Sequence, residues 1–192
     1  MKTQLGLMGS LLAIVLSATG VEAADTKVVM STSSGDITIA LDNAHAPKTV
    51  QNFLRYVSEH HFDGTVVYRV EPGFVIQAGS YEADGHARDV HEPIPLEANN
   101  GLTNLRGTLA MARTDPNTAT AEFFINLADN HELDHRADDK GNTTGYAVFG
   151  KVVSGMNVVD SIAAVPLGGA GPFPPGSTPA KPITISRIAV VP

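Results

Sequence analysis

The 192-residue sequence contains no cysteine and no tryptophan, and it has no surplus of basic residues. Without thiols the chain cannot form disulfides, thiolate zinc sites or iron–sulfur clusters, and it cannot use a cysteine nucleophile. Thirteen basic against twenty acidic residues give a formal net charge of −7, so the charge gives no support to nucleic-acid binding. A composition of 43% hydrophobic and 17% charged residues is typical of a folded protein, and the length suits one domain.

The start of the chain follows the pattern of a secretory signal peptide. Lys2 is followed by an apolar, uncharged run over residues 5–19 and then by small residues. This run is shorter than the ~20 residues that a membrane-spanning helix requires. We therefore predict a signal peptide over residues 1–23, cleaved near Ala23 or Ala24. The mature protein would be periplasmic or secreted, with no attachment to the membrane.

Residues 25–192 read as a single domain of many short strands with two helices. Apolar residues at helical spacing predict one helix from Pro47 to about His60 and another over Ser154–Ala164. This pattern favours a mainly β fold, a closed or nearly closed antiparallel barrel capped by the two helices. Alternating, β-branched or aromatic residues between turn residues predict strands at Val28–Met30, Ile37–Leu41, Thr65–Val70, Phe74–Ala78, Thr108–Ala112, Phe123–Leu127, Tyr146–Val153 and Ile183–Val191.

One short motif suggests metal chemistry. His131, Glu132 and His135 match the H-E-x-x-H pattern of zinc proteases, in which both histidines bind zinc from one face of a long helix. The segment is flanked by polar residues and has no apolar face, and no histidine or glutamate follows it as a third ligand. We interpret it as a loop, expect no metal site, and keep a zinc metalloprotease as the weaker alternative.

A different kind of site is indicated around Arg69. This arginine stands among apolar and aromatic residues, in a segment that Pro72 and Gly73 bend and that continues to Gln77. If Arg69, Phe74 and Gln77 lie on neighbouring strands and face one way, they form an apolar pocket with two hydrogen-bond donors. The alternative is a barrel core in which Arg69 only extends to water.

Four ordered segments resemble the cyclophilin family, and the similarity extends from about Val28 to Val190. The segments are Arg69-x-x-Pro72-Gly73-Phe74-x-x-Gln77, Gly107–Arg113, Phe123–Ile125 and Gly145–Val152. The resemblance implies a closed eight-stranded antiparallel β-barrel capped by two α-helices, and a peptidyl-prolyl cis–trans isomerase that needs no cofactor. Together with the N-terminal pattern, the segment Asn126–Asn130 is similar to the exported bacterial branch.

The resemblance also implies partners and roles. The partners would be proline-containing peptides and unfolded exported proteins, and we expect a monomer. Arg69 would be the catalytic residue and would stabilise a twisted amide in an apolar pocket. A proline-peptide-binding chaperone module without catalysis is the alternative. The residues implied in substrate binding are Phe74, Val75, Gln77, Met111, Ala112, Arg113, Glu122, Phe124, Leu133 and Tyr146.

Several positions depart from the family pattern. Glu122 stands where eukaryotic members usually have Gln, and Glu132 stands where an aromatic residue, usually Trp, is found. Tyr146 replaces a frequent His, and Val75 a frequent Met. Because Arg69 and the phenylalanines are retained, we expect isomerase activity. The missing aromatic ring at Glu132 predicts weak binding of cyclosporin.

Overall fold

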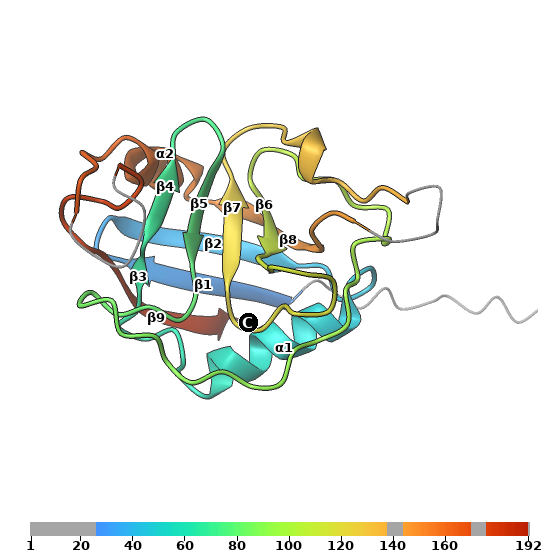
Figure 1. Ribbon diagram of the computed structural model, residues 1–192. Coiled ribbons are helices and arrows are strands. Elements are labelled where there is room, and N and C mark those ends of the chain that lie inside the picture. Colours follow the sequence, from blue (N-terminus) through green and yellow to red (C-terminus); the bar gives the residue numbers. More distant parts are fainter. Residues whose placement is uncertain (1–25, 138–143, 170–175, 192) are drawn as a thin grey trace, which may run out of the picture.

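The computed structural model describes residues 26–137, 144–169 and 176–191, so the predicted signal peptide lies outside the described residues. Nine strands form one antiparallel sheet that curves into a nearly closed barrel, with two α-helices at its ends (Figure 1). The strands follow the order β3-β9-β1-β2-β8-β6-β7-β5-β4. Their bounds are β1 Thr26–Thr32, β2 Gly35–Leu41, β3 Val66–Val67, β4 Arg69–Glu71, β5 Val75–Ala78, β6 Thr108–Met111, β7 Phe123–Asn126, β8 Val148–Ser154 and β9 Ile183–Val191.

The barrel is closed by a single bend of the chain at Tyr68. Strand β3 pairs with β9 and strand β4 pairs with β5, so these two short strands are the ends of the strand order. Only Tyr68 separates them in sequence. The sequence predicted one strand over Thr65–Val70, and the break at Tyr68 is the reason that nine strands are found where the family resemblance implied eight.

Side chains alternate between the barrel interior and its outer face along each strand. In β7, Phe123 and Ile125 belong to the interior core, whereas Phe124 belongs to a separate apolar cluster on the outer face. The ring of Phe53 fills the interior and lies with its centroid 5.1 to 5.5 Å from the rings of Phe62, Phe123 and Phe149. The largest fully buried side chains are Tyr56, Phe53, Phe62, Phe123, Phe149, Met30, Ile37, Ile39, Leu41, Leu109, Met111 and Ile125.

Helix α1 (Pro47–Ser58) is held by a residue that lies far along the chain. The Glu97 carboxylate accepts hydrogen bonds from the backbone amides of Lys48 and Thr49, at 3.2 and 2.8 Å, and from the Thr49 hydroxyl at 2.8 Å. An anion at this end satisfies free amide groups and complements the helix dipole. Glu97 therefore anchors the long segment between β5 and β6 against the helix.

Helix α2 (Met156–Ala163) follows β8 directly after Gly155. That glycine has a φ of +87°, and a Cβ atom there would lie 2.4 Å from the carbonyl oxygen of Asp36. Both helices begin and end within two residues of the predicted positions. None of the helices in the described part of the chain is long and apolar enough to cross a membrane.

The irregular parity of apolar residues along the last strand marks a bulge. Ser31 pairs with Arg187, and the next residue, Thr32, pairs with Ile185. Ser186 is therefore an extra residue on β9, and the register shifts there. The bulge lets Ile185 and Ile188 both enter the core although they are three residues apart.

The core makes a stability prediction. Phe53→Ala removes a ring that contacts three other aromatic rings, and we expect the free energy of unfolding to fall by about 3–5 kcal/mol, measured by chemical denaturation. Val153→Ala is the control, because this valine is 47% exposed on β8, and its effect should stay within about 0.5 kcal/mol. Equal losses in the two variants would contradict the assignment of Phe53 to the core.

Candidate active site

A second, smaller apolar cluster lies on the outer face of β5, β6, β7 and β8. Its fully buried members are Val75, Ala110, Phe124 and Val148. Each of them is a sequence neighbour of a core residue, so the alternation that fills the barrel also builds this outer cluster. The partly buried residues that pack against it are Phe74, Leu102, Ala112, Leu133 and Tyr146.

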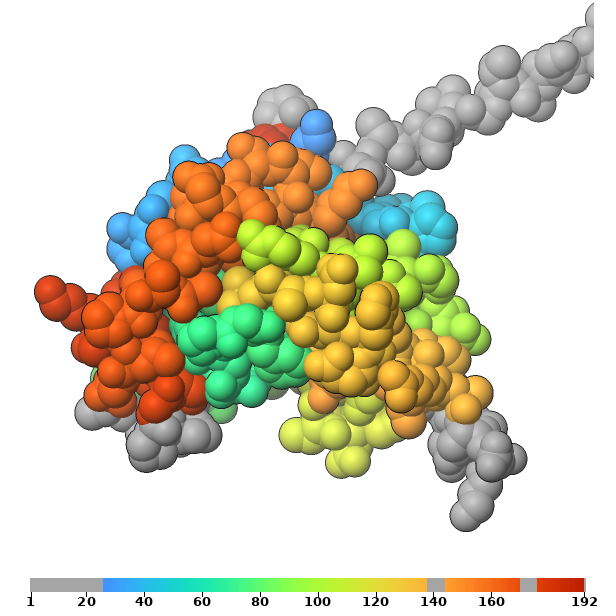
Figure 2. Space-filling model, turned by 90° about the horizontal axis from the view of Figure 1, so that it is seen from above, coloured from blue at the N-terminus to red at the C-terminus, as the bar shows by residue number. Residues whose placement is uncertain are grey.

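A cavity of about 170 Å³ opens on this cluster. The turn between β4 and β5 lies against the segment that follows β7, because Leu127 N–H and Asn130 Nδ2 donate to the carbonyl oxygen of Phe74 at 2.8 and 2.9 Å. Figure 2 shows these two segments side by side on one face, in green and yellow. The cavity is lined by Arg69, Phe74, Val75, Gln77, Ala112, Arg113, Phe124, Leu133 and Tyr146.

The guanidinium of Arg69 is held at the edge of this cavity by two neighbours. Arg69 and Gln77 are paired directly across β4 and β5. Arg69 Nη1 donates to Gln77 Oε1 at 3.1 Å, and Arg69 Nε donates to Glu71 Oε1 at 3.3 Å. With 33% of its side chain exposed, the arginine remains accessible to a ligand in the cavity.

The opposite wall is fixed by a second arginine. Arg113 donates from Nε and Nη2 to the carbonyl oxygen of Gly145, at 2.9 and 2.6 Å. Its guanidinium lies 4.8 Å from the centre of the Tyr146 ring, and that ring meets Phe124 edge-on at 5.5 Å. Bidentate bonding and cation–π stacking together restrict the side chain, so this wall is preformed around an apolar floor.

A cavity with an apolar floor and a fixed, always-charged guanidinium at its edge suits the binding of a neutral amide beside an apolar group. Residues 27–190 match the family model of the cyclophilin type peptidyl-prolyl cis-trans isomerases. The chain belongs to this family. It is therefore a peptidyl-prolyl cis–trans isomerase, with the barrel fold that the sequence led us to expect.

Named relatives agree with this cyclophilin assignment. The chain is 46% identical over 167 residues to peptidyl-prolyl cis-trans isomerase A of Dickeya dadantii, covering 86% of this chain and 85% of that protein. It is 48% identical over 145 residues to isomerase B of Escherichia coli, covering 75% and 88%. A crystal structure of a Cryptosporidium parvum cyclophilin shares the fold, with a TM-score of 0.72 at 23% identity over 88% of this chain and 98% of that one. A second structure from that organism, determined in the presence of the dipeptide Ala-Pro, has a TM-score of 0.71 at 24% identity over 86% of this chain and 99% of that one.

Two residues predicted to bind substrate do not line this cavity of the cyclophilin. Met111 follows Ala110 on β6, so its side chain points into the barrel, where it is 2% exposed within the core. Glu122, which immediately precedes β7, has its Oε2 atom buried and bonds to Ser80 beside the cavity. Tyr68 was not predicted to take part in the site, but its hydroxyl accepts a hydrogen bond from Gln77 Nε2. Because Tyr68 lies at the break between β3 and β4, the alternation of apolar and polar residues does not indicate which way its side chain points.

The H-E-x-x-H segment does not form the long helix that a zinc protease requires. Residues His131–Leu133 form a single 3₁₀ turn, η1, and Asp134 continues in an extended conformation. His131 Nδ1 bonds to Asp134 Oδ2 at 2.9 Å, and this contact raises the pKa of His131, which opposes the neutral form that binds metal. Among the residues described, no group of three or more His, Cys, Asp or Glu side chains is placed to hold a metal ion.

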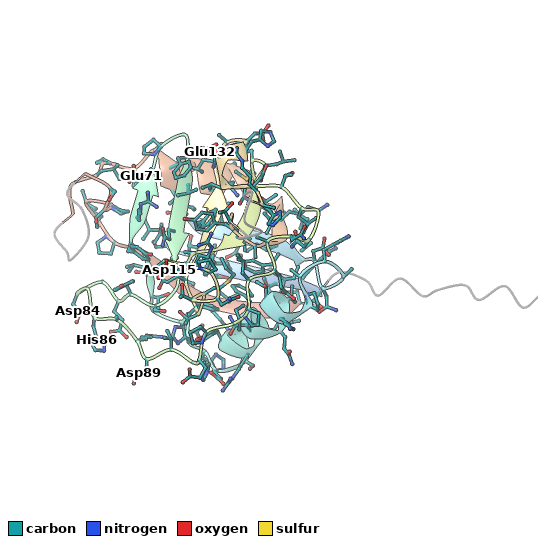
Figure 3. All side chains as sticks on the ribbon, turned by 45° about the vertical axis from the view of Figure 1, so that its right-hand side comes forward. Glu71, Asp84, His86, Asp89, Asp115 and Glu132 are labelled. Atoms are coloured by element: carbon teal, nitrogen blue, oxygen red, sulfur yellow. The ribbon has the colours of Figure 1, made fainter. Side chains whose placement is uncertain are left out.

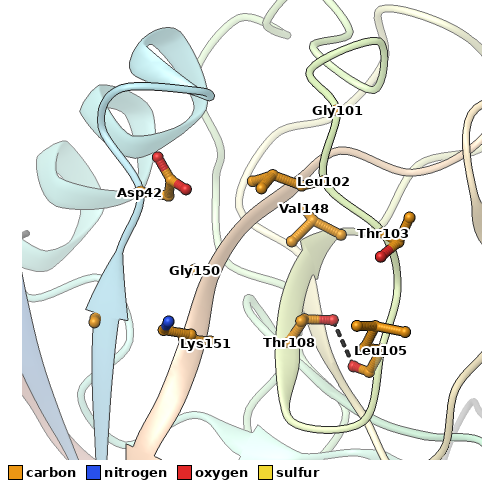
Figure 4. Close-up of a pocket in the computed structure, with 10 residues that line it drawn as sticks. Asp42, Gly101, Leu102, Thr103, Leu105, Thr108, Val148, Gly150 and Lys151 are labelled. Carbon is orange, nitrogen blue, oxygen red and sulfur yellow. Dashed lines mark hydrogen bonds between the residues drawn. The ribbon is translucent and has the colours of Figure 1, made fainter.

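A second cavity, of about 220 Å³, lies beside β2 and β8 (Figure 4). Asp42 and Lys151 flank it, and Leu102 and Val148 contribute apolar surface. The carboxylate of Asp42 already binds His45, through the backbone amide at 3.0 Å and through the ring at 2.8 Å. This cavity holds neither Arg69 nor Phe124, and it serves as an internal comparison for ligand binding.

Titration with a short peptide containing Ala-Pro should distinguish the two cavities by NMR. We expect the amide signals of Ala112 and Arg113 to shift, because these residues line the cavity beside Arg69. The signals of Thr103 and Lys151 at the second cavity should stay unchanged. Shifts concentrated at Thr103 and Lys151 would show that the peptide binds elsewhere and would contradict the site described.

Proposed function

We propose that this cyclophilin accelerates the rotation of X-Pro bonds in exported proteins, and that Arg69 is its catalytic residue. The observation that carries the proposal is the guanidinium held by Gln77 and Glu71 at the edge of a cavity floored by Phe124. The proline ring of the substrate would lie against Phe124, and its amide nitrogen would face Arg69. The Cryptosporidium parvum structure determined with Ala-Pro supports proline-containing peptides as ligands.

The chemistry needs little machinery because no covalent bond breaks. Amide resonance creates a barrier of about 18–20 kcal/mol to rotation, and spontaneous exchange of X-Pro bonds takes tens to hundreds of seconds. When the bond twists, the lone pair returns to the nitrogen, which becomes a better hydrogen-bond acceptor. A donor that meets this nitrogen only in the twisted state lowers the barrier.

Arginine fits this role better than lysine would. It stays charged throughout the physiological pH range, and its donors form a rigid planar fork. In the described structure, Arg69 uses Nε and Nη1 for Glu71 and Gln77, and Nη2 bonds to no described residue. Two bonds thus orient the group while one nitrogen stays available. The surrounding apolar side chains remove water from the amide, which strengthens this interaction.

Two acidic residues lie at the same end of the barrel as the site. Glu132 in η1 and Glu71 in β4 both lie at this end (Figure 3). Glu132 adds a negative charge at the rim, so we propose that the site disfavours acidic substrates. The same residue supplies no ring for packing, which supports the proposed weak binding of cyclosporin.

Substitution of Arg69 tests the catalytic role. In an assay of X-Pro isomerisation, Arg69→Ala should lower kcat/KM by about 100-fold or more, the scale of losing a preorganised donor. Arg69→Lys keeps the charge but loses the planar fork of donors, so its kcat/KM should lie between those of the parent and Arg69→Ala. Arg187→Ala is the matched control, because this arginine is exposed on β9, and its activity should equal that of the parent.

Full activity in Arg69→Ala would contradict the mechanism. Peptide binding without exchange between the cis and trans signals of the bound peptide would instead indicate the non-catalytic binding module. The two outcomes can be told apart. The activity test compares the parent with Arg69→Ala, whereas exchange between the cis and trans signals of the bound peptide is measured on the parent alone.

Export has its own test. If residues 1–23 are a signal peptide, the full chain expressed in a Gram-negative host should be recovered from the periplasm with an N-terminus at Ala24 or Asp25, as mass spectrometry would show. Deletion of residues 5–19 should leave the protein in the cytoplasm. Recovery of the uncleaved parent chain, beginning at Met1, from the cytoplasm would contradict the prediction.

A further inference from the structure

A line of hydrogen-bonded side chains runs from the cavity edge into the molecule. Arg69 Nη1 donates to Gln77 Oε1 at 3.1 Å, and Gln77 Nε2 donates to the hydroxyl of Tyr68. The carboxyl group of Glu122 lies beside that hydroxyl, close enough for each group to shift the pKa of the other, and its Oε2 atom is buried with no hydrogen-bond partner among the described residues. At the far end, the backbone amide of Ser80 donates to Glu122 Oε1 at 2.6 Å.

The two ends of this line fix the direction of every bond within it. A guanidinium can only donate, and a carboxylate can only accept. The Gln77 oxygen must therefore face Arg69, which turns the Gln77 NH₂ group toward Tyr68. The Tyr68 oxygen is then occupied as an acceptor, and its proton is directed at Glu122. A protonated Glu122 carries a donor of its own, which competes with Gln77 Nε2 for the Tyr68 oxygen and weakens the bond that orients Gln77.

The place of Glu122 is built into the backbone around it. A Cβ atom on Gly79 would lie 2.7 Å from both Cα and Cδ of Glu122, so only glycine leaves this space open. The amide of the next residue, Ser80, points at the carboxyl group. Glu122 also stands outside the cavity lining that contains Arg69 and Gln77. Its contacts are directed at the residues behind the site rather than at the ligand space.

We propose that Glu122 is a positioning residue, which in its carboxylate form holds Arg69 in the orientation for isomerisation through Tyr68 and Gln77. The proposal rests on the catalytic role of Arg69 proposed above. It predicts that isomerase activity depends on the protonation of Glu122, a group that does not contact the substrate. It also assigns a role to one of the positions where this chain departs from the family pattern.

The electrostatics agree with this geometry. Burial raises the pKa of Glu122, against the opposing effects of the nearby Tyr68 hydroxyl and of the Ser80 amide that donates to it. Burial also raises the pKa of Tyr68, and the nearby Glu122 carboxyl adds to that effect, so the hydroxyl keeps its proton and remains a donor. Glu122 therefore gains its proton at a higher pH than an exposed glutamate, and activity should fall as the pH decreases through that range.

Other titratable groups near this line need their own controls. Glu71 bonds to Arg69 directly, and the Tyr81 ring packs on Tyr68 at 4.9 Å. His61 Nε2 lies 3.2 Å from the Ser80 hydroxyl. Burial lowers the pKa of His61, and the charge of Arg88 lowers it further. Glu71 and His61 are the groups whose titration could be confused with that of Glu122, so each needs a variant.

The test is the pH profile of kcat/KM, measured with a peptide that has no titratable side chain. The parent protein should lose activity at least about threefold on the acid side, in one protonation step that reports an essential group of the free enzyme. Glu122→Gln is neutral at every pH and cannot titrate, so its profile should be flat over the same range, at the lower activity of the protonated parent. Tyr68→Phe removes the hydroxyl that links Gln77 to Glu122, so its pH profile of kcat/KM should be flat as well. Circular dichroism at each pH verifies that the proteins remain folded.

The two control variants, Glu71→Gln and His61→Gln, should both lose kcat/KM on the acid side of the profile as the parent does. The proposal is overturned if the parent profile is flat, if Glu122→Gln or Tyr68→Phe retains the acid loss, or if either control variant removes it. If Glu122→Gln does not fold, Tyr68→Phe alone decides. An inactive Arg69→Ala with identical profiles in the parent and Glu122→Gln would overturn only this proposal. A fully active Arg69→Ala would overturn the proposed function itself.

Discussion

The period-two alternation of side chains along β5 to β8 is the constraint on which both the core and the site depend. On β7 the inward residues Phe123 and Ile125 fill the barrel, and Phe124 between them floors the cavity. The same rule sends Ile76 inward and Gln77 outward on β5. A shift of register by one residue would therefore empty the core and the site at once. Burial of the large inward residues holds the outward residues in place.

Closure of the barrel adds Arg69, the proposed catalytic residue, to this outer face. Tyr68 links the strand that pairs with β9 to the strand that pairs with β5. Arg69 follows this bend and lies opposite Gln77 in the ladder. The hydroxyl of Tyr68, the residue that closes the barrel, also accepts a hydrogen bond from Gln77 Nε2 in the line behind Arg69. The closure of the barrel and the position of Arg69 are thus connected at one residue.

Local patterns in the sequence sufficed for much of this structure. Alternation and turn residues predicted the strands, and the spacing around Arg69, Phe74 and Gln77 predicted residues that do share one cavity. The failures depend on contacts between distant segments. The split at Tyr68 follows from pairing with two different strands, and the capping of α1 by Glu97 joins residues almost fifty positions apart. Met111, which the family resemblance implied in substrate binding, lies in the barrel core because it alternates with Ala110 along β6, and it does not line the cavity.

The central claim is that Arg69 binds the twisted amide more strongly than either planar isomer. The most direct measurement compares the affinities of two peptides, one with a planar X-Pro bond and one whose prolyl nitrogen is fixed in a pyramidal geometry. The account predicts that the parent protein binds the pyramidal analogue at least about 100-fold more tightly, as transition-state analogues do, and that Arg69→Ala loses this preference. Equal affinities in the parent, or a preference that survives Arg69→Ala, would contradict it.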